Sequence, residues 1–169
     1  PTVARMVLQA DREGVLEEVL VVAAAISVQD PRERPMELKA QADEMHQRFA
    51  HPESDFLTLT NIWNAYRGVG GQPTQGQMRR FCKQNFLSFM RMREWRDIYV
   101  QLSETLREIG GFKINQEAAD HDAIHRAVVS GLLGNIARKK EFNFYQAARG
   151  REVMLFPGSS LFQGRGKSR

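Results

Sequence analysis

Apolar residues recur every three or four positions along most of the chain, and this spacing predicts amphipathic helices. A first short helix ends at Gly14 and presents four apolar side chains on one face: Val3, Met6, Val7 and Ala10. Residues 15–28 are apolar on nearly every side, which is typical of a helix at the centre of a bundle. We therefore expect this segment to form the core.

Three further helices are predicted by residues that favour an N-cap or a first helical turn: Pro35, Ser54, and Thr74 with Gln77. The helix that starts at Pro35 carries four apolar residues at helical spacing: Leu38, Ala42, Met45 and Phe49. After a bend near Ser88 comes the clearest apolar stripe of the chain, which Gly110 and Gly111 close. It consists of Trp95, Ile98, Tyr99, Leu102, Leu106 and Ile109.

A last helix is predicted to begin at Asn115 as its N-cap and to run to Ile136. Gly131 and Gly134 would allow a neighbouring helix to approach closely. Three cations would end this helix, where positive charge favours the helix dipole: Arg138, Lys139 and Lys140.

From Phe142 the pattern changes to two short strands, 142–145 and 153–156, with a turn at Arg149 and Gly150. A two-stranded ribbon is marginal by itself, so we expect it to open a barrel or sheet that is incomplete here. The predicted fold is mainly α: a helical bundle with a short C-terminal β-hairpin. The first residue, Pro1, and the polar end of the chain lead us to expect a piece of a longer protein.

The 169 residues suffice for one ordinary domain with a real core. The single cysteine, Cys82, excludes an internal disulfide framework, and we expect a packed thiol in the cytoplasm. The longest apolar run, residues 19–26, is too short to cross a bilayer, so no membrane association is expected.

Positive charge is concentrated in the second half of the chain. Residues 1–78 carry 7 cations and 11 anions, whereas residues 79–169 carry 17 cations and 9 anions. Residues 79–96 contain six cations and one anion, Glu94, and aromatic residues interleave with the cations. This composition suits phosphates and stacked bases, although most of the aromatic residues should pack in the core and basic faces also occur on proteins that never touch nucleic acid.

Two motifs that suggest catalysis are incomplete. Gly166, Lys167 and Ser168 resemble the end of a phosphate-binding loop, but Leu161 stands where its first glycine is required. His121 and His125 have the spacing of two zinc ligands, but no third ligand is apparent. We therefore expect no catalytic site and no metal in this chain.

Several segments taken in order resemble the helicase-associated region of DEAH-box RNA helicases, closest to the bacterial HrpA type. They are residues 16–20, 25–35, 42–43 with Phe49, 54–59, 81–87, 124–127 and 156–162. Phe56 and Phe81 stand where many eukaryotic members have His and Trp. The resemblance covers almost the whole chain.

This resemblance implies the end of a winged-helix domain at 1–14, a ratchet-like helical bundle at 15–137 and the incomplete start of an OB-fold at 138–169. It also implies that the region holds single-stranded RNA beside two RecA-like motor domains of the same chain. The motor domains would bind ATP and Mg, whose motifs are missing here, so this region alone should be neither an ATPase nor a helicase.

We expect the protein to be a monomer. Nine of its residues should hold the RNA without reading its base sequence. They are Arg79, Arg80, Lys83, Arg93, Arg96, Arg138, Lys139, Ser159 and Ser160. Two alternatives remain. The bundle could dock an acidic partner or the motor domains without touching RNA, or His121 and His125 could serve a metal-dependent hydrolase.

Overall fold

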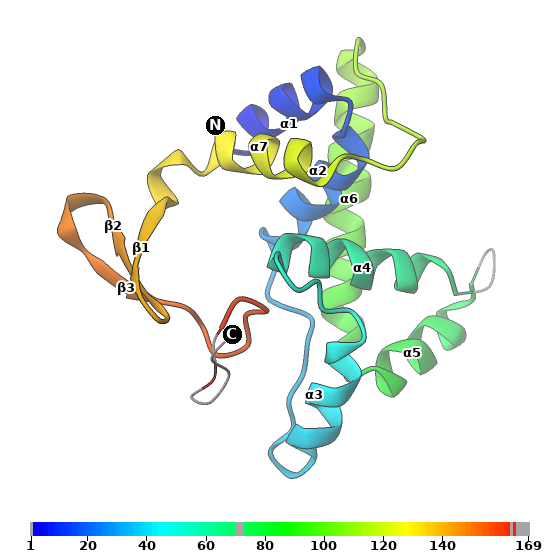
Figure 1. Cartoon of the computed structure of the whole chain (residues 1–169). Helices are drawn as coiled ribbons and strands as arrows, with labels where there is room; N and C mark the ends of the chain where they lie inside the picture. Colours follow the sequence, from blue (N-terminus) through cyan, green and yellow to red (C-terminus); the bar gives the residue numbers. More distant parts are fainter. Residues whose placement is uncertain (1, 70–72, 163, 165–169) are drawn as a thin grey trace.

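The computed structural model describes residues 2–69, 73–162 and 164, and these residues form mainly helices (Figure 1). The α-helices in this part of the chain are α1 (Thr2–Glu13), α2 (Leu16–Ala25), α3 (Lys39–Gln47), α4 (Asp55–Arg67), α5 (Gln75–Gln84), α6 (Phe89–Ile109) and α7 (His121–Gly131). Short 3-10 turns are η1 (Met36–Leu38), η2 (Leu133–Asn135) and η3 (Ala148–Gly150). An antiparallel sheet follows, with strands in the order β1 (Ala137–Glu141), β2 (Phe144–Ala147) and β3 (Glu152–Met154). The predicted mainly helical class is confirmed.

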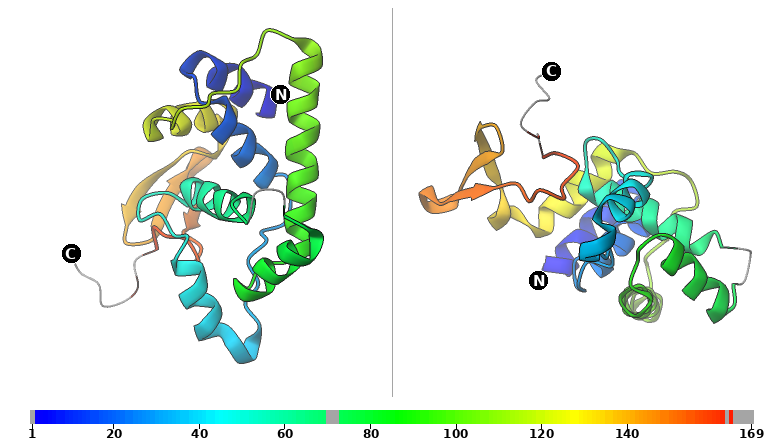
Figure 2. Two further views of the ribbon diagram at one scale, coloured as in Figure 1. Left: turned by 90° about the vertical axis from the view of Figure 1, so that its right-hand side faces the viewer. Right: turned by 90° about the horizontal axis from the view of Figure 1, so that it is seen from below.

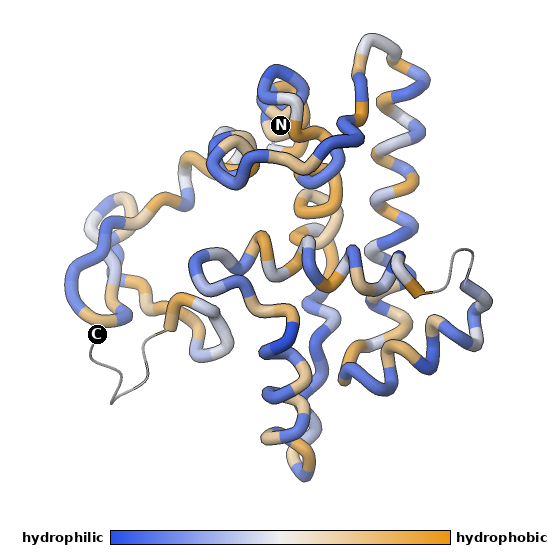
Figure 3. The backbone as a smooth tube through the Cα atoms, turned by 45° about the vertical axis from the view of Figure 1, so that its right-hand side comes forward, coloured by the Kyte–Doolittle hydropathy of each residue, from blue (hydrophilic) through white to orange (hydrophobic). Residues whose placement is uncertain are grey.

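Helix α2 lies at the centre of the helical part, as its all-round apolar pattern predicts. Beyond Glu17 and Glu18 in its first turn, the tube is hydrophobic along this helix (Figure 3). It packs against α1, α4, α6 and α7, and its buried residues contribute to both clusters of the core. Trp95 of α6 donates a hydrogen bond from Nε1 to the carbonyl of Val21 at 2.9 Å. The long helix α6 therefore joins the two clusters along one side of α2.

Local start signals are confirmed where the cap and the helix are neighbours in sequence. The side chain of Ser54 accepts from the N–H of Leu57, and Thr74 and Gln77 form the predicted capping box. Ser88 caps α6, so the predicted bend is a break between α5 and α6. Gly14, at φ +70°, ends α1.

The helix predicted from Pro35 is divided into η1 and α3, and its apolar stripe is mostly unburied. Ala42 is fully buried, whereas Leu38 is 41% exposed. This segment lies at the edge of the bundle, beyond the reach of α2 (Figure 1). The spacing was typical of a helix, but apart from Ala42 and the partly buried Phe49 the rest of the bundle covers little of it among the described residues.

The predicted start and end of the last helix are wrong. Asp120 caps α7 by accepting from the N–H of Ala123, because it stands directly before the helix and Asn115 does not. The helix stops at Gly131, and Ile136 is 55% exposed in an extended conformation. Gly131 packs against α1 as predicted, but no atom comes within 4 Å of a Cβ built at Gly134.

The predicted hairpin is confirmed as β2 and β3, with Tyr145 opposite Val153, and it gains a third strand, β1. Arg138 and Lys139 belong to β1, where they pair with Gln146 and Tyr145, and do not end a helix. Three successive cations suit a helix C-terminus and an exposed edge strand equally well, so charge alone could not separate the two.

No helix in the described residues combines the length and the apolar character that spanning a membrane requires. Of the sequence motifs considered, Gly166, Lys167 and Ser168 lie outside the described residues.

Candidate nucleic-acid interface

Five of the predicted RNA-binding cations lie together on α5 and α6, and we call them the α5–α6 basic surface: Arg79, Arg80, Lys83, Arg93 and Arg96. The two helices are joined by the short connection 85–88 and contact each other. All of these side chains are exposed except that of Arg93, which is half-buried. The structure therefore places this part of the predicted set on two helices that contact each other.

The charge of this surface is largely uncompensated. Among the described residues, no carboxylate forms an ion pair with Arg79, Arg80, Lys83 or Arg93. Arg96 forms an exposed ion pair, in which its Nη2 lies 3.6 Å from Oδ1 of Asp97. Exposed pairs of this kind are weak, so they leave the positive potential in place.

Four acidic groups of the first half pair with cations outside this surface. Their ion pairs join Asp30 to Arg32, Asp43 to Arg34, Glu17 to Arg67, and Glu13 to Arg126. None of these four carboxylates forms an ion pair with the α5–α6 basic surface.

An aromatic ring supports one of these cations. The guanidinium carbon of Arg79 lies 4.5 Å from the centroid of the Phe89 ring, a cation–π arrangement. Phe81 and Phe89 also pack against the second core cluster, and Trp95 is fully buried. The prediction that most of these aromatic residues serve packing is confirmed.

Cys82 lies beneath the same surface as a packed thiol. It is 1% exposed, and burial, assisted by the charge of Glu33, raises its pKa to about 11. A thiol that stays protonated in this way is a poor nucleophile. The prediction of a packed cysteine is confirmed.

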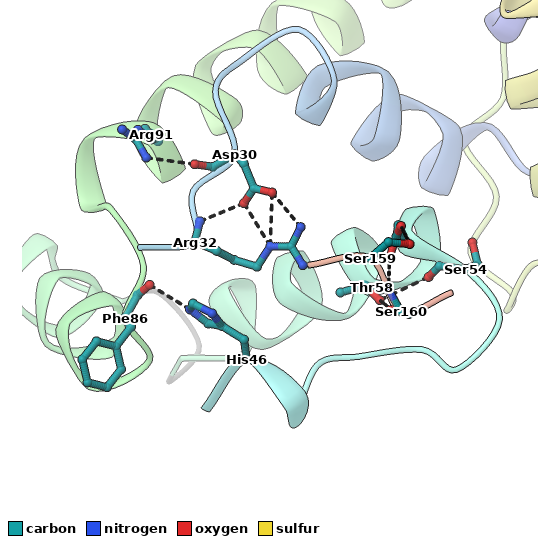
Figure 4. Close-up of polar contacts among 10 residues, drawn as sticks. Asp30, Arg32, His46, Ser54, Thr58, Phe86, Arg91, Ser159 and Ser160 are labelled. Atoms are coloured by element: carbon teal, nitrogen blue, oxygen red, sulfur yellow. Dashed lines mark hydrogen bonds and ion pairs between the residues drawn. The ribbon is translucent and has the colours of Figure 1, made fainter. Parts of the chain in front are cut away.

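The connection between α5 and α6 is held by residues 30–33 and by α3 (Figure 4). The carbonyl of Phe86 accepts from the N–H of Glu33 at 2.8 Å and lies 3.0 Å from Nε2 of His46. Phe86 has φ +51°, an uncommon value for a residue with a side chain, so these contacts hold a strained turn. Arg91 donates from Nη1 to the carbonyl of Asp30 at 3.0 Å.

The segment that holds this connection contains an ion pair that the sequence did not indicate. Nη2 of Arg32 donates to Oδ2 of Asp30 at 2.6 Å. Burial alone would raise the pKa of Asp30, but the hydrogen bonds and charge of Arg32 outweigh it and lower that pKa. The pair therefore stays ionised and braces the turn.

Arg138 and Lys139 form a second, separate group on β1. Both are exposed, and no carboxylate pairs with either among the described residues, whereas the neighbouring Lys140 pairs with Glu152. Two views show the sheet and α5 on opposite sides of the molecule (Figures 1 and 2). The predicted nine residues thus do not form one continuous patch in this chain.

Ser159 and Ser160 lie in a third place, at the N-terminal end of α4. Oγ of Ser159 donates to Oδ2 of Asp55 at 2.5 Å, and the N–H of Ser160 donates to Oδ1 at 2.8 Å. Sequence reasoning missed Asp55, although it directly follows the N-cap Ser54 and therefore starts a helix.

The two histidines considered for a metal have other contacts. Nδ1 of His125 lies 2.6 Å from the carbonyl of His121, and its Nε2 lies 2.7 Å from Oγ of Ser54. In the part of the chain that the structure describes, no three His, Cys, Asp or Glu side chains gather as metal ligands would. The geometry gives a metal-dependent hydrolase no support.

Comparison with known proteins identifies the region to which this chain is similar. Residues 1–59 match the family described as "Helicase associated domain (HA2), ratchet-like". The chain is 41% identical to ATP-dependent RNA helicase HrpA of Escherichia coli (strain K12) and 42% identical to its homolog in Haemophilus influenzae, over 96% of this chain and 12% of each relative. It is 28% identical to the probable ATP-dependent RNA helicase DHX35 of Pongo abelii, over 96% of this chain and 22% of that protein. The chain thus spans only a small part of these relatives' length.

Proposed function

Because the chain belongs to the helicase-associated region of HrpA-type DEAH-box RNA helicases, we propose that it holds single-stranded RNA against the motor domains of the same protein. The observation that carries this proposal is the α5–α6 basic surface, whose exposed cations lack carboxylate partners among the described residues, apart from the weak pair of Arg96. Such cations attract phosphates by releasing counterions, and they do so without reading the sequence of bases.

Arg138 and Lys139 would contact a second stretch of the same strand. We propose that their sheet opens an OB-fold completed by residues beyond this chain. ATP and Mg would be bound by motor domains that also lie elsewhere, and the whole protein would act as a monomer in the cytoplasm. This chain would bind the RNA, while the motor domains would drive the movement.

The proposal is tested by reversing two charges on α6 in the full-length protein, with Arg93→Glu and Arg96→Glu combined. We expect weaker binding of single-stranded RNA and lower RNA-stimulated ATPase activity. The slope of log affinity against log salt should become shallower by about 0.7 for each phosphate that the variant no longer neutralises. Wild-type values in both assays would reject the assignment.

Arg107→Glu is the matched control, because Arg107 is an exposed arginine near the other end of the same helix and lies close to Glu104. It should leave RNA binding unchanged.

The other candidate function is that this basic surface docks an acidic protein or the motor domains. In that case the double reversal would abolish that association and leave the salt dependence of RNA binding as in the wild type.

A further inference from the structure

The sheet is attached to the helical part mainly at its two ends. Its strands contact one another and make few contacts with the helices, and it stands beside the bundle in Figure 1 and in the right-hand view of Figure 2. At its start, the chain leaves α7, which packs along α1. At its end, residues 157–162 return to α4. The position of the sheet therefore depends on these two attachments.

The returning segment is held by one carboxylate. Asp55 accepts from the hydroxyl of Ser159 at 2.5 Å through one oxygen and from the N–H of Ser160 at 2.8 Å through the other. The hydroxyl of Ser160 also lies 3.3 Å from Oγ1 of Thr58. Asp55 opens α4, where negative charge is favoured by the helix dipole.

The hydroxyl protons of Ser159 and Ser160 both already take part in hydrogen bonds. Ser159 gives its proton to Asp55 and accepts from the N–H of Leu161. The Thr58 hydroxyl donates to the carbonyl of Ser54 and accepts from a backbone N–H. Its proton is therefore already used, so Ser160 is the donor in the hydrogen bond between the hydroxyls of Ser160 and Thr58.

A phosphate oxygen can only accept hydrogen bonds, so these serines have no proton left for it. The carboxylate of Asp55 beside them would also repel a phosphate.

We propose that Asp55 is a positioning residue that latches the end of the sheet to α4, and that this is the role of Ser159 and Ser160. We call the four side chains Asp55, Thr58, Ser159 and Ser160 the α4 latch. By fixing the sheet, the latch sets the distance between Arg138 and Lys139 and the cations of the α5–α6 basic surface. Only this last consequence rests on the proposed function, since the latch itself does not require RNA.

Hydrogen–deuterium exchange in the full-length protein without RNA tests the latch directly. With Asp55→Ala or Ser159→Ala, the amide of Ser160 should exchange about ten- to a hundredfold faster, as the loss of charge-assisted hydrogen bonds implies. Ser159 lies in a surface turn, so its replacement leaves the bundle folded. The double variant should exchange no faster than Asp55→Ala alone, because both changes break one latch. Unchanged exchange in both single variants would overturn the proposal.

Asp122→Ala is the matched control. Asp122 is also a carboxylate in the first turn of a helix, but no hydrogen bond to its side chain is found among the described residues. This change removes the same interaction with a helix dipole without touching the latch, so exchange at Ser160 should stay at the wild-type rate.

RNA affinity separates the latch from direct phosphate contact by the serines. Direct contact predicts opposite effects on RNA affinity. Ser159→Ala would remove a donor and weaken binding, while Asp55→Ala would remove a repulsive charge and strengthen it. The latch predicts that both variants change RNA affinity in the same direction, and opposite directions would overturn it. Failure of the Arg93 and Arg96 reversal to weaken RNA binding would reject the proposed function and leave the exchange result intact.

Discussion

The backbone N–H of Glu17 donates a hydrogen bond to Oδ1 of Asn115, 98 positions further along the chain, at 2.9 Å. Val15, the residue before α2, does not cap this helix with its side chain. Nδ2 of Asn115 in turn donates to Oε2 of Glu18 at 2.9 Å. One remote amide therefore satisfies a first-turn N–H of the most buried helix and ties it to the segment that follows α6.

Replacing Asn115 by alanine should lower the free energy of unfolding by about 1–2 kcal/mol, because it leaves a first-turn N–H of α2 without its acceptor. Urea unfolding followed by circular dichroism measures this loss. The control is Asn64→Ala on the exposed side of α4, where no hydrogen bond to the side chain is found among the described residues and alanine favours the helix. Equal stability of the two variants would contradict a capping role for Asn115.

Gly131 and Gly134 give a second matched pair. A Cβ at Gly131 would lie 2.6 Å from both Cγ of Met6 and the carbonyl oxygen of Thr2, so α1 would have to move. Gly131→Ala should destabilise the protein by about 1–3 kcal/mol, as overpacking does. Gly134→Ala meets no atom within 4 Å and should be close to neutral. Thermal unfolding of both variants measures the difference, and equal melting temperatures would show that α1 and α7 are not in tight contact.

The two tryptophans allow one buried hydrogen bond to be measured. Trp63 and Trp95 are both buried, with ring centroids 5.2 Å apart, but only Trp95 has an acceptor for its Nε1, while Trp63 Nε1 finds none among the described residues. Phenylalanine removes similar volume at either position. Trp95→Phe should therefore cost about 1–2 kcal/mol more than Trp63→Phe in urea unfolding. If Trp63→Phe cost as much or more, the bond to Val21 would contribute no net stability.

Helix caps show which features of the fold the sequence could predict. Ser54 and the Thr74–Gln77 box act within three residues, so their patterns were sufficient. Asn115 also has the composition of a cap, but its helix comes nearly a hundred residues earlier, and only the packed bundle brings them together. The cations of β1 were misassigned for a related reason: their strand is defined by pairing with β2, not by their own sequence.

The candidate interface was predictable to the same degree. The apolar stripe correctly placed Trp95 in the core, and Arg96 beside it is exposed, because direction along one helix follows from position alone. The meeting of Asp55 with Ser159 depends on how a loop returns to a helix 104 positions earlier, which no local pattern specifies. Chemistry within one helix could be predicted, and chemistry between distant segments could not.

The pair formed by Glu13 and Arg126 should give the protein a defined sensitivity to acid. Hydrogen bonds from Arg126, and then from Gln9, lower the pKa of Glu13 from 4.5 to about 2. A carboxylate whose pKa is lowered by folding stabilises the native state above its unfolded pKa. This contribution should be present above about pH 4.5 and disappear as the pH falls towards 2.

Carbon-13 NMR of the Glu13 carboxyl should show a titration midpoint near 2, and Arg126→Ala should move it up towards 4.5. Arg12→Ala is the control, because Arg12 lies beside Glu13 in sequence and on the same helix but makes no hydrogen bond to it in the structure. Since each variant removes one positive charge, a midpoint that moves equally in both would mean that general charge, and not the two bonds from Arg126, holds the carboxylate ionised. A midpoint that moves only with Arg126 would also establish that α1 and α7 stay docked in acid, because Glu13 is the last residue of α1 and Arg126 lies in the middle of α7.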